Sequence, residues 1–142
     1  MDTLDHKHML VFAYVQKPPK VVEQLEDWFR RLVDAVGMKV LIEPKCVYCD
    51  TAGNEGITGT VCIETSHASI HFWEKHDRNP EFSCVQFDLY SCKDYDPQTV
   101  INMIAEFGII DYQYMIIDRN ADFQVSQQTF LRDVSEYRKK SA

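Results

Sequence analysis

The chain has 142 residues, of which 45% are hydrophobic and 26% charged, as expected for one folded domain with its own core. No apolar run is long enough to cross a bilayer, and a net charge of -7 without a basic stripe leaves nothing to neutralise phosphates, so we expect neither a membrane nor a nucleic-acid partner. Five cysteines indicate reduced thiols, and the N-terminal residues lack the order of a secretory signal, so we expect a cytoplasmic protein.

The first expected strand covers residues 8–16, and Pro18-Pro19 ends it. Apolar residues then recur every three or four positions from Val21 to Val36, which predicts a helix closed by Gly37. The remaining pattern predicts strands at 38–49, 57–65, 67–74, 84–92 and 111–118, a helix from Asp96-Pro97 to Gly108, and a weaker helix over 124–140.

Alternation along the three central strands separates an apolar face from a polar one. Both helices should cover the apolar face, which leaves the other face for a ligand, a subunit partner or both. On that second face the pattern places Thr58, His71 and Cys92. We therefore predict an α+β fold over residues 1–142. It is a two-layer α/β sandwich with a mainly antiparallel sheet, helices on one face, and the active site or a dimer interface on the other.

Residues 56–92 carry a dense set of motifs, which are Gly56-Ile57-Thr58-Gly59, Ser66-His67, Ile70-His71, Trp73, and Asp88 with Cys92. In these motifs the chain resembles the small prokaryotic S-adenosylmethionine decarboxylases, self-processing enzymes with a pyruvoyl group. The resemblance implies a homodimer that decarboxylates S-adenosylmethionine, a small amino-acid-derived substrate, for spermidine and other polyamine synthesis.

The resemblance also implies roles for individual residues. The chain would cut itself between Thr65 and Ser66, where the Ser66 hydroxyl attacks the Thr65 carbonyl and elimination leaves a pyruvoyl group derived from Ser66. His71 would be the processing residue, assisted by the Thr58 hydroxyl. The pyruvoyl carbonyl would form a Schiff base with the substrate's amino group, and Cys92 would return a proton to the substrate.

The residues expected to bind the substrate are Trp73, Glu74, Glu64 and Tyr48. The family carries an aromatic residue where this chain has Ala52, and Tyr48 or Trp73 would replace it. The family also carries glutamate where this chain has Thr65, with Glu64 one place earlier. Two alternatives therefore stay open. One is a pyruvoyl-dependent ornithine or arginine decarboxylase, and the other is an unprocessed, non-catalytic homologue that binds a ligand or dimerises.

Three spacings in the sequence carry further expectations. Ser66 lies five residues before His71, so an ideal strand would point them to opposite faces, and we expect a kink, bulge or turn at the Thr65–Ser66 bond. Cys46 and Cys49 have the spacing of a zinc site, but no second such pair exists and we expect no metal. His67 and His71 are four apart on a strand, too far apart for one metal ion.

Overall fold

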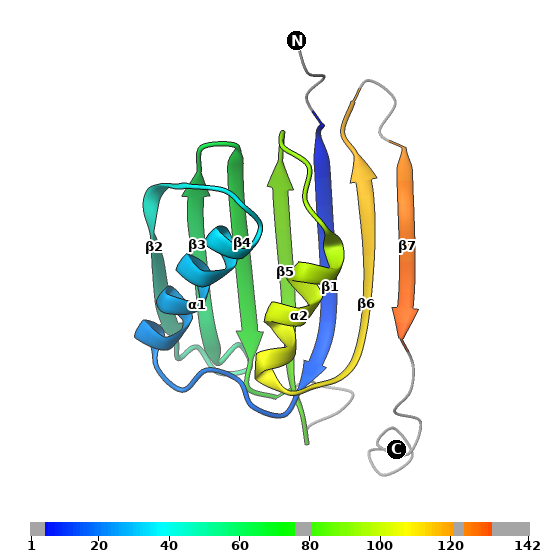
Figure 1. Ribbon diagram of the computed structural model, residues 1–142. Coiled ribbons are helices and arrows are strands. Elements are labelled where there is room, and N and C mark those ends of the chain that lie inside the picture. Colours follow the sequence, from blue (N-terminus) through cyan, green and yellow to red (C-terminus); the bar gives the residue numbers. More distant parts are fainter. Residues whose placement is uncertain (1–4, 76–80, 121–123, 132–142) are drawn as a thin grey trace.

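The computed structural model describes residues 5–75, 81–120 and 124–131. Within them lies an antiparallel sheet of seven strands in the order β2-β3-β4-β5-β1-β6-β7. Both helices lie on the same side of this sheet (Figure 1). In chain order the elements are β1 (Lys7–Val15), α1 (Val22–Ala35), β2 (Val40–Cys49), β3 (Gly56–Ile63), β4 (Ser66–Trp73), β5 (Ser83–Ser91), α2 (Pro97–Ile104), the 3-10 turn η1 (Ala105–Phe107), β6 (Ile109–Asp118) and β7 (Val125–Leu131). The predicted two-layer α+β fold is confirmed, and the sheet face that neither helix covers is called the open face below.

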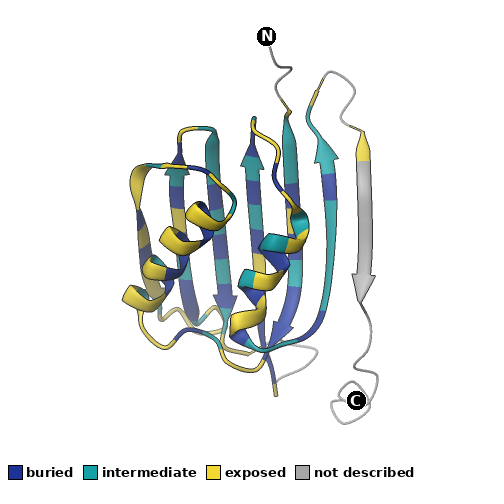
Figure 2. Ribbon diagram, in the orientation of Figure 1, coloured by how far each residue is buried: buried dark blue, intermediate teal, exposed yellow. Residues whose placement is uncertain are grey.

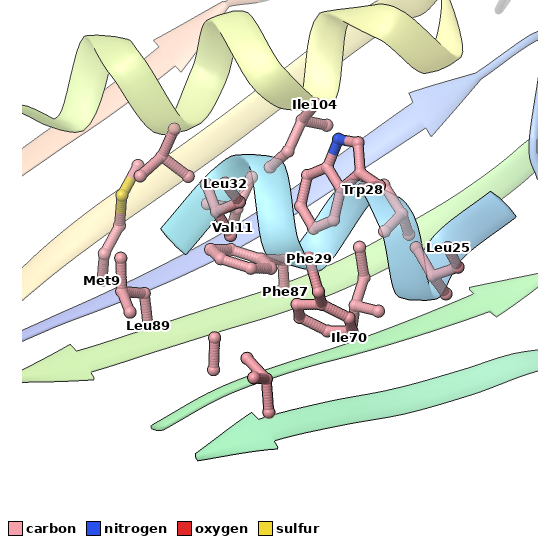
Figure 3. Close-up of a cluster of buried hydrophobic side chains, with 14 of the residues drawn as sticks. Met9, Val11, Leu25, Trp28, Phe29, Leu32, Ile70, Phe87, Leu89 and Ile104 are labelled. Carbon is pink, nitrogen blue, oxygen red and sulfur yellow. The ribbon is translucent and has the colours of Figure 1, made fainter. Parts of the chain in front are cut away.

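Helix α1 lies on the core because its apolar residues recur at helical spacing. Its buried side chains are Leu25, Trp28, Phe29, Leu32 and Val33, and Figure 3 shows four of them packed over the sheet. The indole N–H of Trp28 donates to the backbone carbonyl of Met103 at 2.9 Å, which links α1 to α2. Gly37 follows the helix with φ 74°, a left-handed conformation that glycine adopts without strain.

Helix α2 begins where the sequence predicts. The Asp96 side chain accepts a hydrogen bond from the Gln98 amide, and Pro97 occupies the first helical position. Val100, Ile101 and Ile104 face the core. Neither described helix is long and apolar enough to span a membrane.

Burial alternates along the central strands, as Figure 2 shows. The side chains that face the helices are buried, while their neighbours in sequence are mostly half-buried on the open face. The core-facing residues of the four central strands are Met9, Val11, Ala13 and Val15, then Ile57, Val61 and Ile63, then Ala68, Ile70 and Phe72, then Val85, Phe87 and Leu89. This alternation fixes which side chains remain available on the open face.

The C-terminal tail differs from the prediction. Residues 125–131 form strand β7, which pairs with β6 from Tyr112↔Leu131 to Ile117↔Val125, so the predicted helix over 124–140 is wrong in that part. Pairing satisfies the backbone groups of the otherwise open edge of β6, and this tertiary contact outweighs a weak local helix preference. The rest of the predicted helix, residues 132–140, lies outside the described residues.

Gly59 is a position where β2, β3 and α1 meet without room for a side chain. A Cβ atom there would lie 2.3 Å from the Cys46 sulfur and 3.0 Å from the Phe29 ring. We expect Gly59→Ala to lower the free energy of unfolding by about 1–3 kcal/mol because the core would be overpacked. The midpoint of urea unfolding measures this loss. Lys45→Ala, an exposed change on β2, is the control and should change stability little.

Candidate active site

The β3–β4 turn contains the peptide bond that the sequence marks for cleavage. Ile63 pairs with Ser66, so only Glu64 and Thr65 form the turn. Ser66 has φ 147°, and among the described residues it alone combines a positive φ with a side chain. L-residues rarely adopt such a conformation, and it costs about 1–3 kcal/mol. The Thr65–Ser66 bond thus lies at a strained turn, which confirms the irregularity predicted there.

The carbonyl of Thr65 has a hydrogen-bond donor already in place. The backbone N–H of Cys92 donates to this oxygen at 3.0 Å. The contact arises because Ser66 pairs with Ser91, the last residue of β5. A donor at this oxygen would stabilise the negative charge that develops when a nucleophile attacks the carbonyl. The Cys92 side chain is half-buried, and since β5 ends at Ser91, strand alternation does not determine the direction of the thiol.

The Ser66 hydroxyl lies next to a different histidine from the one that the motifs suggested. Its Oγ is 3.2 Å from Nδ1 of His67. Nε2 of His67 is in turn 3.8 Å from Oδ2 of Asp88, and the same oxygen is 3.0 Å from Nε2 of His8. The sequence motifs contain His67 next to Ser66, but they assign no part in cleavage to His67 or His8. Alternation places His67 and Asp88 on the polar face, but it cannot show that β1 and β4 both flank β5.

A second polar cluster lies farther along β3 and β4. Thr58 and His71 are cross-strand partners, with Thr58 Oγ1 3.1 Å from His71 Nδ1. The His71 ring is 5.7 Å, centroid to centroid, from the indole of Trp73. That indole donates to the Asn54 side chain at 2.7 Å and packs against a small second group of buried apolar residues. We call this the His71 cluster: Thr58, His71 and Trp73.

The fold of the single chain does not bring its two clusters together. We call Thr65, Ser66, His67 and Cys92 the cleavage cluster; it lies at the end of the sheet where β3 turns into β4 and β5 ends (Figure 1). Ser66 and His71 are five residues apart on the same strand, which at about 3.3 Å per residue is roughly 16 Å. No side chain spans that distance, so His71 cannot contact the Ser66 hydroxyl of the same chain.

The expected substrate-binding residues fall in three places. Trp73 belongs to the His71 cluster, and Glu64 is exposed in the turn beside Thr65. Tyr48 and Glu74 form a separate pair, in which the tyrosine hydroxyl donates to the carboxylate at 2.8 Å and its pKa is raised by that hydrogen bond.

Tyr48 and Glu74 also line a cavity of about 940 Å³. Ile57 and Phe72 line the same cavity, and their side chains belong to the core. The pair therefore lies on the helix side of the sheet, away from Thr58 and His71 on the open face.

The Cys46–Cys49 pair does not share a side of the sheet. The Cys46 thiol packs in the core, and burial raises its pKa to about 12. Cys49 lies three residues later on the same strand, so its side chain points the other way; hydrogen bonds with Thr51 lower its pKa. Across the described ranges, no group of three or more His, Cys, Asp or Glu residues is placed to hold a metal ion.

Comparison with known proteins places the chain in a family. The family model for S-adenosylmethionine decarboxylase matches residues 7–120. An S-adenosylmethionine decarboxylase proenzyme from Pyrococcus abyssi is 24% identical over 141 residues, which cover 99% of this chain and 94% of that protein. The corresponding proenzyme from Archaeoglobus fulgidus is 26% identical over 115 residues, covering 80% and 96%.

A solved structure shows the same fold. The crystal structure of the adenosylmethionine decarboxylase from Aquifex aeolicus superposes with a TM-score of 0.64 at 20% identity, covering 89% of this chain and 100% of that one. The family match spans most of the chain, and it includes both clusters described above. The chain therefore belongs to the S-adenosylmethionine decarboxylase family, in its small prokaryotic form, and is a decarboxylase, an enzyme of the carboxy-lyase class.

Proposed function

We propose that this chain is a proenzyme that cuts itself before Ser66 and then decarboxylates S-adenosylmethionine, supplying the aminopropyl donor for spermidine synthesis. The observation that carries the proposal is the Thr65–Ser66 bond, which combines a strained φ of 147° at Ser66 with a Cys92 N–H on the Thr65 carbonyl. Breaking this bond releases the strain. The names of the two archaeal relatives, both proenzymes, support the same reading.

The surroundings of Ser66 fit a pyruvoyl group made from that serine. After a cut between Thr65 and Ser66, residue 66 becomes a chain end, while the pairing of β4 with β5 keeps it opposite Ser91 and next to Cys92. A pyruvoyl group there would supply an electron-withdrawing carbonyl close to the substrate's α-carbon. No metal is needed for this chemistry, and we assign none.

The chain's own residues then have separate tasks. The Cys92 thiol returns a proton to the substrate's α-carbon, and His71, oriented by the Thr58 hydroxyl, acts in processing. The indole of Trp73 offers an aromatic face beside His71 for the substrate's adenine. Glu64 offers an exposed carboxylate beside the cleavage bond. Tyr48 and Glu74 lie on the helix side of the sheet, so we do not place them among the residues that contact the substrate.

We further propose a homodimer in which each site uses both protomers. In this dimer the open faces of the two protomers would lie against each other. The two-fold axis that relates them would run perpendicular to the strands and pass between the two clusters. It would set the cleavage cluster of one protomer opposite the His71 cluster of the other. The same axis would place an apolar hollow of about 440 Å³ against its own copy. That hollow lies on the open face and is lined by Leu10, Phe12 and Met115, with Gln86 and Gln113.

Two measurements test the proposed function. On a denaturing gel with intact-mass analysis, the incubated protein should give fragments of residues 1–65 and 66–142, the second with a blocked N-terminus. Release of labelled carbon dioxide should then be highest from S-adenosylmethionine when ornithine and arginine are assayed in parallel. A chain that stays whole on long incubation would establish the non-catalytic homologue instead. A preference for ornithine or arginine would make that amino acid the proposed substrate, in keeping with the departures from the family pattern at Ala52 and Thr65.

Cys92→Ala separates the two contributions of this residue. Alanine keeps the backbone N–H that bonds the Thr65 carbonyl, so we expect the chain still to be cut. Loss of the thiol should reduce carbon dioxide release by roughly a hundredfold or more, the usual contribution of a positioned proton donor. Cys46→Ala, which removes a thiol on the helix side of the sheet, is the control and should keep its activity. Undiminished carbon dioxide release by Cys92→Ala would reject the thiol as proton donor.

A further inference from the structure

A chain of polar contacts begins at the Ser66 hydroxyl and runs across the open face. It passes from Ser66 Oγ to His67 Nδ1 at 3.2 Å, and from His67 Nε2 to Asp88 Oδ2 at 3.8 Å. We propose that His67, held by Asp88, is the base that activates the Ser66 hydroxyl for the first step of self-cleavage. The inference rests on the proposed self-cleavage and assigns to this step two residues that no role above includes.

The carboxylate of Asp88 selects the form of His67 that can act as a base. A neutral imidazole carries one proton, and a ring whose Nε2–H points toward a carboxylate leaves Nδ1 free to accept. Nδ1 is the atom that faces the Ser66 hydroxyl. At 3.8 Å the pair is too long for a hydrogen bond but close enough for an ion pair, so it strengthens once His67 takes up a proton.

The sheet register explains why these groups meet. His67 on β4 is paired with Tyr90 on β5, and Tyr90 is paired with His8 on β1, while Asp88 lies two residues from Tyr90 on the same face. The two histidines therefore flank the tyrosine ring, at 6.0 Å for His67 and 5.7 Å for His8, and converge on Asp88. The groups that face His67 are Asp88 and Tyr90 from β5, His8 from β1 and Cys62 from β3.

His8 also contacts the Asp88 carboxylate. Its Nε2 is 3.0 Å from the Asp88 oxygen that faces His67, and it is the more buried histidine, with 19% of its side chain exposed against 43%. This second contact on the carboxylate fixes its direction. Asp88 is thus a positioning residue for His67, and His8 in turn positions Asp88.

The step balances without any further reactant. Ser66 Oγ forms a bond to the Thr65 carbonyl carbon, and the bond from that carbon to the Ser66 nitrogen breaks. The hydroxyl proton passes to His67 Nδ1 and from there to the departing nitrogen, which becomes an amine. The Cys92 N–H stabilises the charge on the Thr65 oxygen meanwhile. An amide has become an ester with no net change in protons.

This assignment divides self-cleavage between two histidines. All groups for the ester-forming step lie within one protomer, since Ser66, His67, Asp88 and the Cys92 amide are in contact there. His71 lies roughly 16 Å from Ser66 along β4. It can therefore reach Ser66 only from a partner, and we assign it to the step after ester formation. A chain without His71 should still form the ester, whereas a chain without His67 should not.

The test compares His67→Ala and His71→Ala as purified full-length chains. Hydroxylamine cuts esters under conditions that leave amides intact, so it reports the first step directly. We expect it to cut His71→Ala between residues 65 and 66 and to leave His67→Ala whole. Spontaneous cleavage of His67→Ala should be slower than that of the wild type by roughly a hundredfold or more, and added imidazole should restore part of the rate. Asp88→Asn should slow cleavage too, without rescue by imidazole.

The matched control is His6→Gln, because His6 lies on the same face but bonds the Tyr90 hydroxyl, at 3.0 Å, instead of Asp88. It should cleave like the wild type, and circular dichroism should show that every variant is folded. The role of His67 would be overturned if His67→Ala cleaved itself as fast as the wild type, or if hydroxylamine cut it between residues 65 and 66 as it cuts His71→Ala. Either result would leave the proposed function standing. A wild-type chain that never cleaves would overturn both.

Discussion

Ser66→Ala is expected to remain one intact chain of 142 residues under conditions that cut the wild type. The Ser66 hydroxyl adjoins the Thr65 carbonyl in the chain and lies 3.2 Å from Nδ1 of His67, the base proposed above. Its removal should therefore abolish cleavage, the blocked N-terminus and carbon dioxide release together. Intact mass and a denaturing gel measure the first two. Ser69→Ala, a change to another serine on the open face of β4, should cleave normally.

The strained backbone of Ser66 adds a second readout to this experiment. Alanine at φ 147° bears the same strain as serine, whereas glycine adopts that conformation readily. Ser66→Gly should therefore be uncut like Ser66→Ala, but more stable than it by about 1 kcal/mol in urea unfolding. Cleavage of either variant at the same bond would remove Ser66 from its role. Equal stability would argue that the turn is not strained.

Mixing two inactive variants should restore decarboxylation if each site is built from both protomers. Ser66→Ala lacks the nucleophile of the cleavage cluster, and His71→Ala lacks the histidine of the other cluster, so neither alone should release carbon dioxide. A mixed dimer has one complete site, formed by Ser66 of one chain and His71 of the other. Random pairing makes half of all dimers mixed, so we expect about a quarter of wild-type activity after co-refolding.

A mixture of two variants from the same cluster provides the matched control. Ser66→Ala and Cys92→Ala both alter the cleavage cluster, so their mixed dimer has no complete site and should be no more active than Cys92→Ala itself. Native mass spectrometry should show that both mixtures form mixed dimers. If the Ser66→Ala and His71→Ala chains pair without recovering activity, the shared site is wrong.

The sequence predicted the elements and the faces because both depend on local spacing. Helix α1 follows from apolar residues at intervals of three and four, and its end from Gly37. The common face of Thr58 and His71 follows from the period of two along a strand, and the structure confirms it with a 3.1 Å contact. The odd spacing of Ser66 and His71 likewise predicted the turn at Thr65.

Contacts between distant segments could not be predicted in the same way, because the period of a strand says nothing about which strand lies beside it or in what register. The Cys92 amide reaches the Thr65 carbonyl only because Ser66 pairs with Ser91. Strand β7 forms because the edge of β6 is open, against a local preference. Tyr48 and Glu74 meet only because β2 and β4 both flank β3.

The sequence alone therefore predicted the fold class and the family, and it pointed to the bond that we propose to break. Tertiary structure decided which groups surround that bond. It set His67 and Asp88 beside Ser66, and placed His71 roughly 16 Å away along the same strand. The physical reason is that side-chain direction is a property of each strand, whereas a catalytic site is a property of how strands are set against one another.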